Sequence, residues 1–164
     1  MALLPVTSIQ YDNESTGNNN KTALVDRSNL HMYHCTYVAT TAGVGAAYPI
    51  GLLPAGEITI HPSLSRLVSS AYVSTADIDV GYAAYVEEDG TAVVADPNGW
   101  FDSVDAGGGA KDLPWSASPG ILTTGPVTYE SQEGIPITFS VDTADMSIGD
   151  TLDLYVAYTG GSAN

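Results

Sequence analysis

The chain has 164 residues, with nineteen acidic side chains against four basic ones and a net charge of −15. A nucleic-acid-binding protein needs several Lys or Arg side chains to displace counterions from phosphates, so we expect no nucleic-acid partner. Repulsion likewise excludes binding to an anionic membrane surface. The length is that of one domain that buries roughly 70% of its unfolded-chain surface, and 44% hydrophobic residues is typical of a folded chain.

Residues 1–29 are predicted to form an N-terminal arm, because residues 11–29 are polar and turn-rich without a sustained period. Such an arm becomes ordered only when it packs against a neighbouring molecule or against the side of its own domain. The alternative is an ordinary first strand at Leu3–Ile9 followed by a long loop. The arm side chains expected to make such contacts are Leu3, Leu4, Val6 and Ile9.

Residues 30–160 are predicted to form one domain of short strands. Period-two alternation and richness in Val, Ile, Thr and Tyr mark the candidates. They are Leu30–Thr40, Glu57–His61, Arg66–Ser74, Asp77–Val86, Val127–Tyr129, Ile135–Asp142 and Thr151–Tyr158. Pro136 predicts an edge position for its strand, since proline cannot donate to the ladder.

The stretch from Asp96 to Asp105 is predicted to contain a single short helical turn. Asp96 is a capping residue, and Pro97 follows at the first helical position. The whole pattern predicts seven or eight short strands, with one long insertion before the last three. Alternation on nearly every strand is typical of two packed antiparallel sheets, a β-sandwich such as a jelly roll. Alternation does not encode strand order, so it does not separate a jelly roll from other sandwiches.

Cys35 is the single cysteine, which excludes an intrachain disulfide and a cysteine-based zinc cage. The nearby His31 and His34 are three residues apart, so on a strand they point to opposite faces and do not chelate one ion. His31 and Cys35 share a face but lie roughly 13 Å apart along a strand. We therefore expect no metal site here, and two half-buried strand histidines.

Catalytic patterns are also missing, and the sequence predicts a protein that is not an enzyme. No Gly-x-Ser-x-Gly elbow is present. An enzyme would need a cleft that gathers His34 or His61 with a carboxylate. No phosphate-binding glycine loop occurs, so no cofactor is expected.

Two ligand-binding alternatives remain from the residue types alone. Acidic clusters around Asp77, Glu87 and Asp142 supply carboxylates for calcium, but none has EF-hand spacing, and the simpler interpretation is a solvated acidic surface. Four aromatic residues offer a sugar platform or, more simply, a plug for the end of the core or an interface. They are Trp100, Phe101, Trp115 and Tyr129.

Three stretches resemble small structural proteins of tailed bacteriophages. These stretches run over Leu53–Leu67 (LPAGEITIHPSLSRL), Asp77–Tyr82 (DIDVGY) and Thr151–Tyr158 (TLDLYVAY), and the opening Met1–Val6 (MALLPV) is similar as well. That group includes jelly-roll head decoration, or cement, proteins. The motifs are turn-and-strand patterns, and no site residue is carried over from them.

The resemblance implies a virion protein on the outer capsid surface, often a homotrimer, whose partner is the major capsid protein. It would be made in the host cytoplasm, and its role would be to bind and stabilise the capsid. The acidic balance agrees, because an outer-surface protein does not touch packaged DNA. The alternative function is a carbohydrate- or calcium-dependent β-sandwich binding module, whose stability would rise with its ligand.

Overall fold

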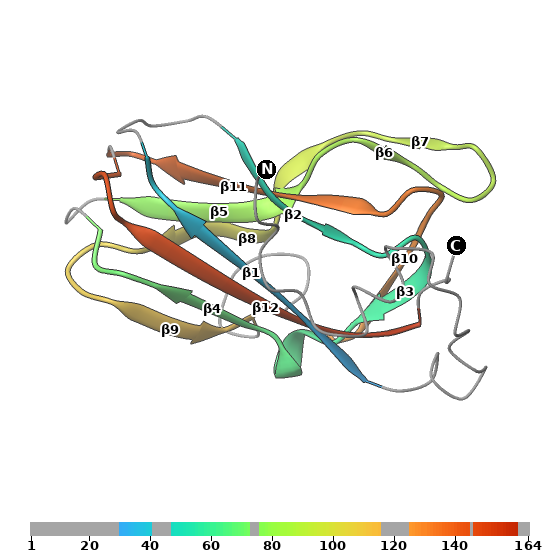
Figure 1. The fold of residues 1–164 in the computed structure, drawn as a ribbon, viewed down its shortest axis with the longest axis horizontal. Coiled ribbons are helices and arrows are strands. Elements are labelled where there is room, and N and C mark those ends of the chain that lie inside the picture. Colours follow the sequence, from blue (N-terminus) through green and yellow to red (C-terminus); the bar gives the residue numbers. More distant parts are fainter. Residues whose placement is uncertain (1–29, 41–46, 73–75, 116–124, 145, 161–164) are drawn as a thin grey trace, which may run out of the picture.

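The computed structural model describes residues 30–40, 47–72, 76–115, 125–144 and 146–160. They form two antiparallel sheets that pack face to face, with a small hairpin projecting beyond them (Figure 1). Sheet I contains β1 (His31–Val38), β3 (Gly56–Ile60), β4 (Arg66–Ser69), β9 (Lys111–Pro114), β10 (Val127–Ser131) and β12 (Thr151–Gly160). Sheet II contains β2 (Tyr48–Leu53), β5 (Asp77–Tyr82), β8 (Asp96–Asp105) and β11 (Ile135–Asp142). The hairpin is β6 (Tyr85–Val86) with β7 (Ala92–Val93), and no helix in these ranges is long and apolar enough to cross a membrane.

The order of the strands identifies the sandwich as a jelly roll. In sheet I, β12 pairs with β1 on one side and with both β4 and β3 on the other, and β9 and β10 flank those two. Sheet II has the order β2, β11, β5, β8. Counting β3 with β4, and β9 with β10, as single positions gives eight, ordered 1-8-3-6 and 2-7-4-5 along the chain. This interleaving is the double Greek key of a jelly roll, so the predicted fold class is confirmed.

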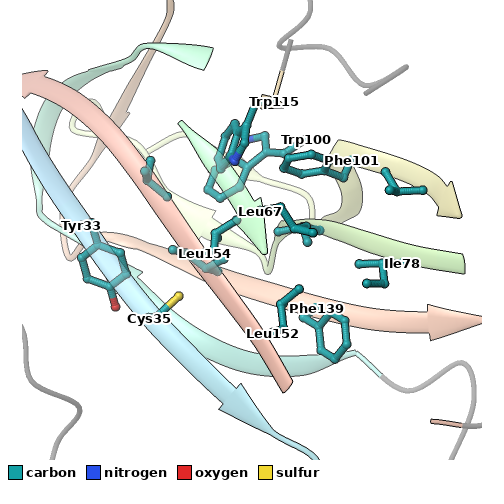
Figure 2. Packing of buried hydrophobic residues seen from close by; sticks show 14 of the residues in the cluster. Tyr33, Cys35, Leu67, Ile78, Trp100, Phe101, Trp115, Phe139, Leu152 and Leu154 are labelled. Carbon is teal, nitrogen blue, oxygen red and sulfur yellow. The ribbon is translucent and has the colours of Figure 1, made fainter. Parts of the chain in front are cut away.

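The core lies between the inner faces of the two sheets. Figure 2 shows leucine, isoleucine and aromatic side chains from both sheets meeting there. At one end Trp115 packs against Trp100 and Phe101, with ring centroids 5.3 and 5.1 Å apart, and all three side chains are fully buried. Aromatic pairs at such distances add to the stability that comes from their buried area.

The predicted helical turn between Asp96 and Asp105 is wrong, because this stretch is strand β8. Its pairing with β5 is interrupted by two register shifts, and the stretch from Pro97 to Trp100 has no partner in β5. Pro97 therefore removes no ladder hydrogen bond. With this irregular pairing, the consecutive residues Trp100 and Phe101 are both fully buried, which one exposed helical turn would not achieve. The short 3-10 turn lies instead at η2 (Pro62–Leu64).

The unpaired part of β8 crosses closely over β5 at Gly81. A Cβ atom at that residue would lie 2.0 Å from the carbonyl oxygen of Asp96, which no real side chain tolerates. Glycine is therefore required here for close approach of two backbones. The result is that the outer face of β5 is covered rather than exposed to solvent.

The edge position predicted from Pro136 is also wrong, because β11 is an inner strand between β2 and β5. Pairing with β5 begins one residue later, at Ile137 opposite Tyr82. The Pro136 carbonyl still accepts a hydrogen bond from the Ala83 N–H at 3.0 Å. Proline is tolerated because it stands just before the first residue that pairs with β5.

The junction of β3 and β4 interrupts the ladder along β12, and a serine side chain fills the gap. Ser65 Oγ accepts a hydrogen bond from the Ala157 N–H and donates one to the His61 carbonyl, both at 2.9 Å. Ser65 is buried. Its hydroxyl therefore replaces the backbone acceptor that an uninterrupted strand would present to β12.

Candidate functional site

The predicted contact residues Leu3, Leu4, Val6 and Ile9 lie outside the described residues, as does the whole of the predicted arm. The arm and its contacts stay predictions.

The histidines of β1 point to opposite faces, as predicted. His31 is buried on the inner side with Cys35, whereas His34 lies on the outer face. Its ring stacks on Tyr155 of β12, with centroids 4.3 Å apart, and its Nε2 lies 3.0 Å from Asp153 Oδ1. Burial, followed by the charge of Asp153, raises the pKa of the Cys35 thiol to about 12, so this cysteine is inert.

A Thr, a His and an Asp meet on this outer face without forming a catalytic relay. Thr36 Oγ1 and Asp153 Oδ1 both contact the same nitrogen of His34, Nε2. A relay needs the nucleophile on one ring nitrogen and the carboxylate on the other. His61, the other candidate base, has its Nε2 3.1 Å from Thr159 Oγ1. His34 therefore does not have the geometry of a general base in a nucleophile relay.

A second polar group lies on the outer face of sheet II. Asp79 is only 6% exposed and accepts a hydrogen bond from the Ser103 N–H at 2.7 Å. Burial raises the pKa of Asp79 to about 6; the Ser103 N–H opposes this shift, and Asp142 and Asp102 add to it. Asp79 is thus an exception to the predicted solvated acidic surface. In the described part of the chain, no three His, Cys, Asp or Glu side chains are grouped to hold a metal ion.

The proposed aromatic platform for sugars is contradicted by burial. Trp100, Phe101 and Trp115 have no exposed surface. The Tyr129 hydroxyl accepts a hydrogen bond from Trp100 Nε1 at 3.0 Å. These residues close one end of the core, which is the simpler of the two sequence interpretations.

Exposed apolar side chains lie at both ends of β1, which among the described strands pairs only with β12. We call Leu30, Met32 and Val38 the β1 strip, and they are 52%, 44% and 51% exposed. On the same face, the polar residues His34 and Thr36 lie between Met32 and Val38. An edge strand that carries exposed apolar side chains is a ready template for association with another surface.

A second apolar surface is a pocket of about 390 Å³ where the hairpin leaves sheet II, and we call it the groove. Leu52 and Val86, on either side of it, are 40% and 41% exposed. The remaining lining residues are Ala84, Tyr85, Gln132, Glu133, Gly134 and Pro136. Sequence reasoning missed the groove, because its walls come from β2, β6 and β11, which only the fold brings together. The one available signal was the apolar Leu52 beside the Leu-Pro-Ala-Gly turn.

No protein-family model and no curated protein matches the chain. Among solved structures, it is similar to a chain of the cyanophage Pam1 capsid asymmetric unit, with a TM-score of 0.48 and 13% identity over 80% of this chain and 84% of that one. It is also similar to a chain of infectious bursal disease virus strain Gx, with a TM-score of 0.41 and 12% identity over 83% of this chain and 38% of that one. A third similarity is to the acidic stable capsid of Helicobacter pylori bacteriophage KHP30, with a TM-score of 0.34 and 18% identity over 82% and 95%.

These structural neighbours come from viral particles. Every identity is below 20% and every TM-score is below 0.5, so no family and no activity is transferred from them to this chain. The jelly-roll order of its strands stands on the pairing within the chain itself.

Proposed function

We propose that this protein is a virion structural protein that binds the outer surface of a phage capsid and stabilises it, as decoration proteins do. Its partner would be the major capsid protein, and its own copies would associate as a homotrimer. The sequence resemblance to head decoration proteins motivates the proposal. The observation that carries it is the β1 strip, which puts exposed apolar side chains at both ends of an edge strand in an acidic jelly roll.

The physical argument begins with the exposed apolar area on this edge. Isolated apolar side chains are common on protein surfaces, but on an edge strand they stand beside backbone groups that can pair with a further strand. A partner that covers β1 buries the apolar side chains and also pairs with the backbone groups. A standard interface buries about 800 Å² on each partner, so the strip would form the centre of a larger contact.

Net charge favours the outer surface over the inner one. A protein with a charge of −15 is repelled by packaged nucleic acid and also by its own copies, so association between its copies must come from shape and apolar area. Many copies bound to one lattice add their contributions, so no single residue is expected to dominate. The predicted contacts of Leu3, Leu4, Val6 and Ile9 would add to those of the strip.

The test measures binding to empty capsids of the virus that encodes the chain, by co-sedimentation. Met32→Ser combined with Val38→Ser is expected to weaken binding at least tenfold, while Val94→Ser leaves it unchanged. Val94 is the matched control, because it is 82% exposed and lies away from the strip, after β7. Circular dichroism checks that all variants keep the β fold. If the wild-type chain does not sediment with capsids, the proposal fails.

A truncation separates the arm from the strip. Removing residues 1–12 is expected to weaken binding to capsids while the β fold is kept. Unchanged affinity would remove the arm from the proposal and leave the strip. Addition of calcium or of a saccharide is expected to leave the melting temperature unchanged, whereas a rise would support a ligand-binding module instead.

A further inference from the structure

Backbone contacts hold the groove in shape on two sides. Gln132, in the turn between β10 and β11, donates from its N–H to the Val86 carbonyl at 2.9 Å and from its side chain to the Glu88 carbonyl at 3.4 Å. These bonds tie the projecting hairpin (Figure 1) to that turn. On the other side, a Cβ atom at Gly134 would stand 2.3 Å from the Leu53 carbonyl oxygen, so only glycine fits against β2. The groove is therefore preformed, which lowers the cost of binding.

The size of the groove limits its occupant to a few side chains. Its volume of about 390 Å³ is at the lower end of the range of about 300–1,000 Å³ that ligand pockets span. Leu52 and Val86 are both partly exposed in it, so an apolar occupant removes both from water. The fitting occupant is a short apolar segment rather than a broad protein surface.

Three carboxylates form what we call the acidic border of the groove. Glu133 lines the groove, and Glu87 and Glu88 directly follow the lining residue Val86. Within the described ranges, none of these three side chains has a hydrogen-bond or ion-pair partner. Unpaired carboxylates around an apolar hollow attract a segment that carries positive charge beside its apolar side chains.

The described part of a second copy does not supply that charge. Its two Lys and Arg side chains are Arg66 and Lys111. Arg66 forms a two-pronged ion pair with Asp112 across β4 and β9, and Lys111 Nζ lies 3.7 Å from Asp105 Oδ2. Both cations are therefore already paired, and the net charge of −15 adds repulsion between copies. The occupant that fits is a different protein that brings its own Lys or Arg.

We propose that the groove binds a short extended segment of another protein, in which two apolar side chains, two residues apart, are flanked by Lys or Arg. In an extended segment, side chains two residues apart point to the same face and lie about 7 Å from each other. Both apolar side chains then pack against Leu52 and Val86, and the flanking cations reach the acidic border. The groove shares no residue with the β1 strip, so this inference goes beyond the proposed capsid binding and does not depend on it.

A synthetic peptide with blocked ends, Gly-Lys-Leu-Ser-Leu-Lys-Gly, tests the proposal on the full-length chain. Calorimetry measures its Kd, and amide NMR spectra are expected to show the largest shifts at Val86, Gln132 and Gly134. Two control peptides carry Glu in place of both Lys, or Ser in place of both Leu, and are expected to bind at least tenfold more weakly. The proposal is overturned if the first peptide shows no saturable binding up to about 1 mM, or if the charge-reversed peptide binds equally well.

Paired variants test the apolar floor. Leu52→Ser with Val86→Ser is expected to weaken peptide binding at least tenfold. The matched control is Leu64→Ser with Ile148→Ser, since these side chains are 52% and 73% exposed and do not line the groove. Circular dichroism checks that both double variants keep the β fold. Equal effects of the two pairs would overturn the proposal. Self-association that the groove pair abolishes, as read by light scattering, would also overturn it by assigning the groove to a second copy.

Charge removal tests the acidic border. Glu88→Gln with Glu133→Gln is expected to weaken peptide binding severalfold at low salt, with a smaller effect at high salt because exposed charges are screened. The control is Asp102→Asn with Asp105→Asn in β8, at the opposite edge of sheet II from β2, and it is expected to leave binding unchanged. Binding that is insensitive to the border variant would overturn the role of the cations. Because no capsid enters these measurements, their failure is distinct from failure of the proposed function.

Discussion

At the scale of single residues, the described structure assigns physical roles to several polar or reactive side chains. Ser65, which follows His61 closely in the sequence, completes a backbone ladder. His34 stacks on Tyr155, and Cys35 is a buried apolar residue. Asp79 differs from these, because burial raises the pKa of its carboxyl group, and the change in its protonation can be followed in solution.

Asp79→Asn is predicted to change how stability depends on pH. The folded pKa of Asp79, about 6, lies above its ordinary value of 3.8, so between these values the folded state binds more protons than the unfolded state. Stability is therefore lost as pH rises from about 4 to 6, by on the order of 2 kcal/mol. Asparagine still accepts from the Ser103 N–H but does not ionise.

The measurement is urea denaturation at pH 4.5 and pH 7 for wild type and Asp79→Asn. The variant is expected to gain stability relative to wild type at pH 7 and to gain less at pH 4.5. Glu57→Gln, on an exposed position of β3, controls for the loss of one negative charge. The same pH dependence in wild type and Asp79→Asn would contradict the prediction.

At the scale of elements, the structure depends on irregular junctions between otherwise regular strands. The β5–β8 pair has two register shifts and a glycine under a crossing backbone. The junction of β3, η2 and β4 keeps the ladder to β12 through one hydroxyl. Such irregularities bend a strand or interrupt pairing at fixed positions, and each depends on particular residues.

Ser65→Ala is predicted to destabilise the fold by about 1–3 kcal/mol, because it leaves the Ala157 N–H buried without its acceptor. Ser63→Ala, in the same turn but exposed, is the matched control and is expected to change stability by less than about 0.5 kcal/mol. Chemical denaturation of the two variants gives the difference directly. Equal stabilities would mean that another group takes over the role of the Ser65 hydroxyl.

At the scale of the whole molecule, net charge opposes self-association and the exposed apolar surfaces favour it. The predicted homotrimer would have three times the chain mass of 17.0 kDa. Light scattering is expected to find this mass, more completely at high salt because screening weakens repulsion between acidic copies. Calcium is expected to have no effect beyond that of ionic strength. A monomer at all salt concentrations would contradict the trimer.

Much of the fold was predictable from the sequence, because period-two alternation reports which strands have one face in the core. The strands around His31, Ile58, Phe139 and Leu154 were predicted close to their observed positions. Strands β2, β7 and β9 were missed, since they are short and lack clear alternation. Strand β8 was misjudged because its helix-start signal, Asp96-Pro97, was outweighed by burial of Trp100 and Phe101 in the core.

The sequence by itself determined the all-β class, the acidic surface and the opposite faces of His31 and His34, because these follow from composition and from the pleat of a strand. Tertiary structure alone decided the jelly-roll order, the inner position of Pro136 and the burial of Asp79. It also decided that Leu52, Val86 and Glu133 line one groove. The physical reason is that pairing between strands distant in sequence leaves no local pattern, so neighbours in space are fixed only when the two sheets close on their core.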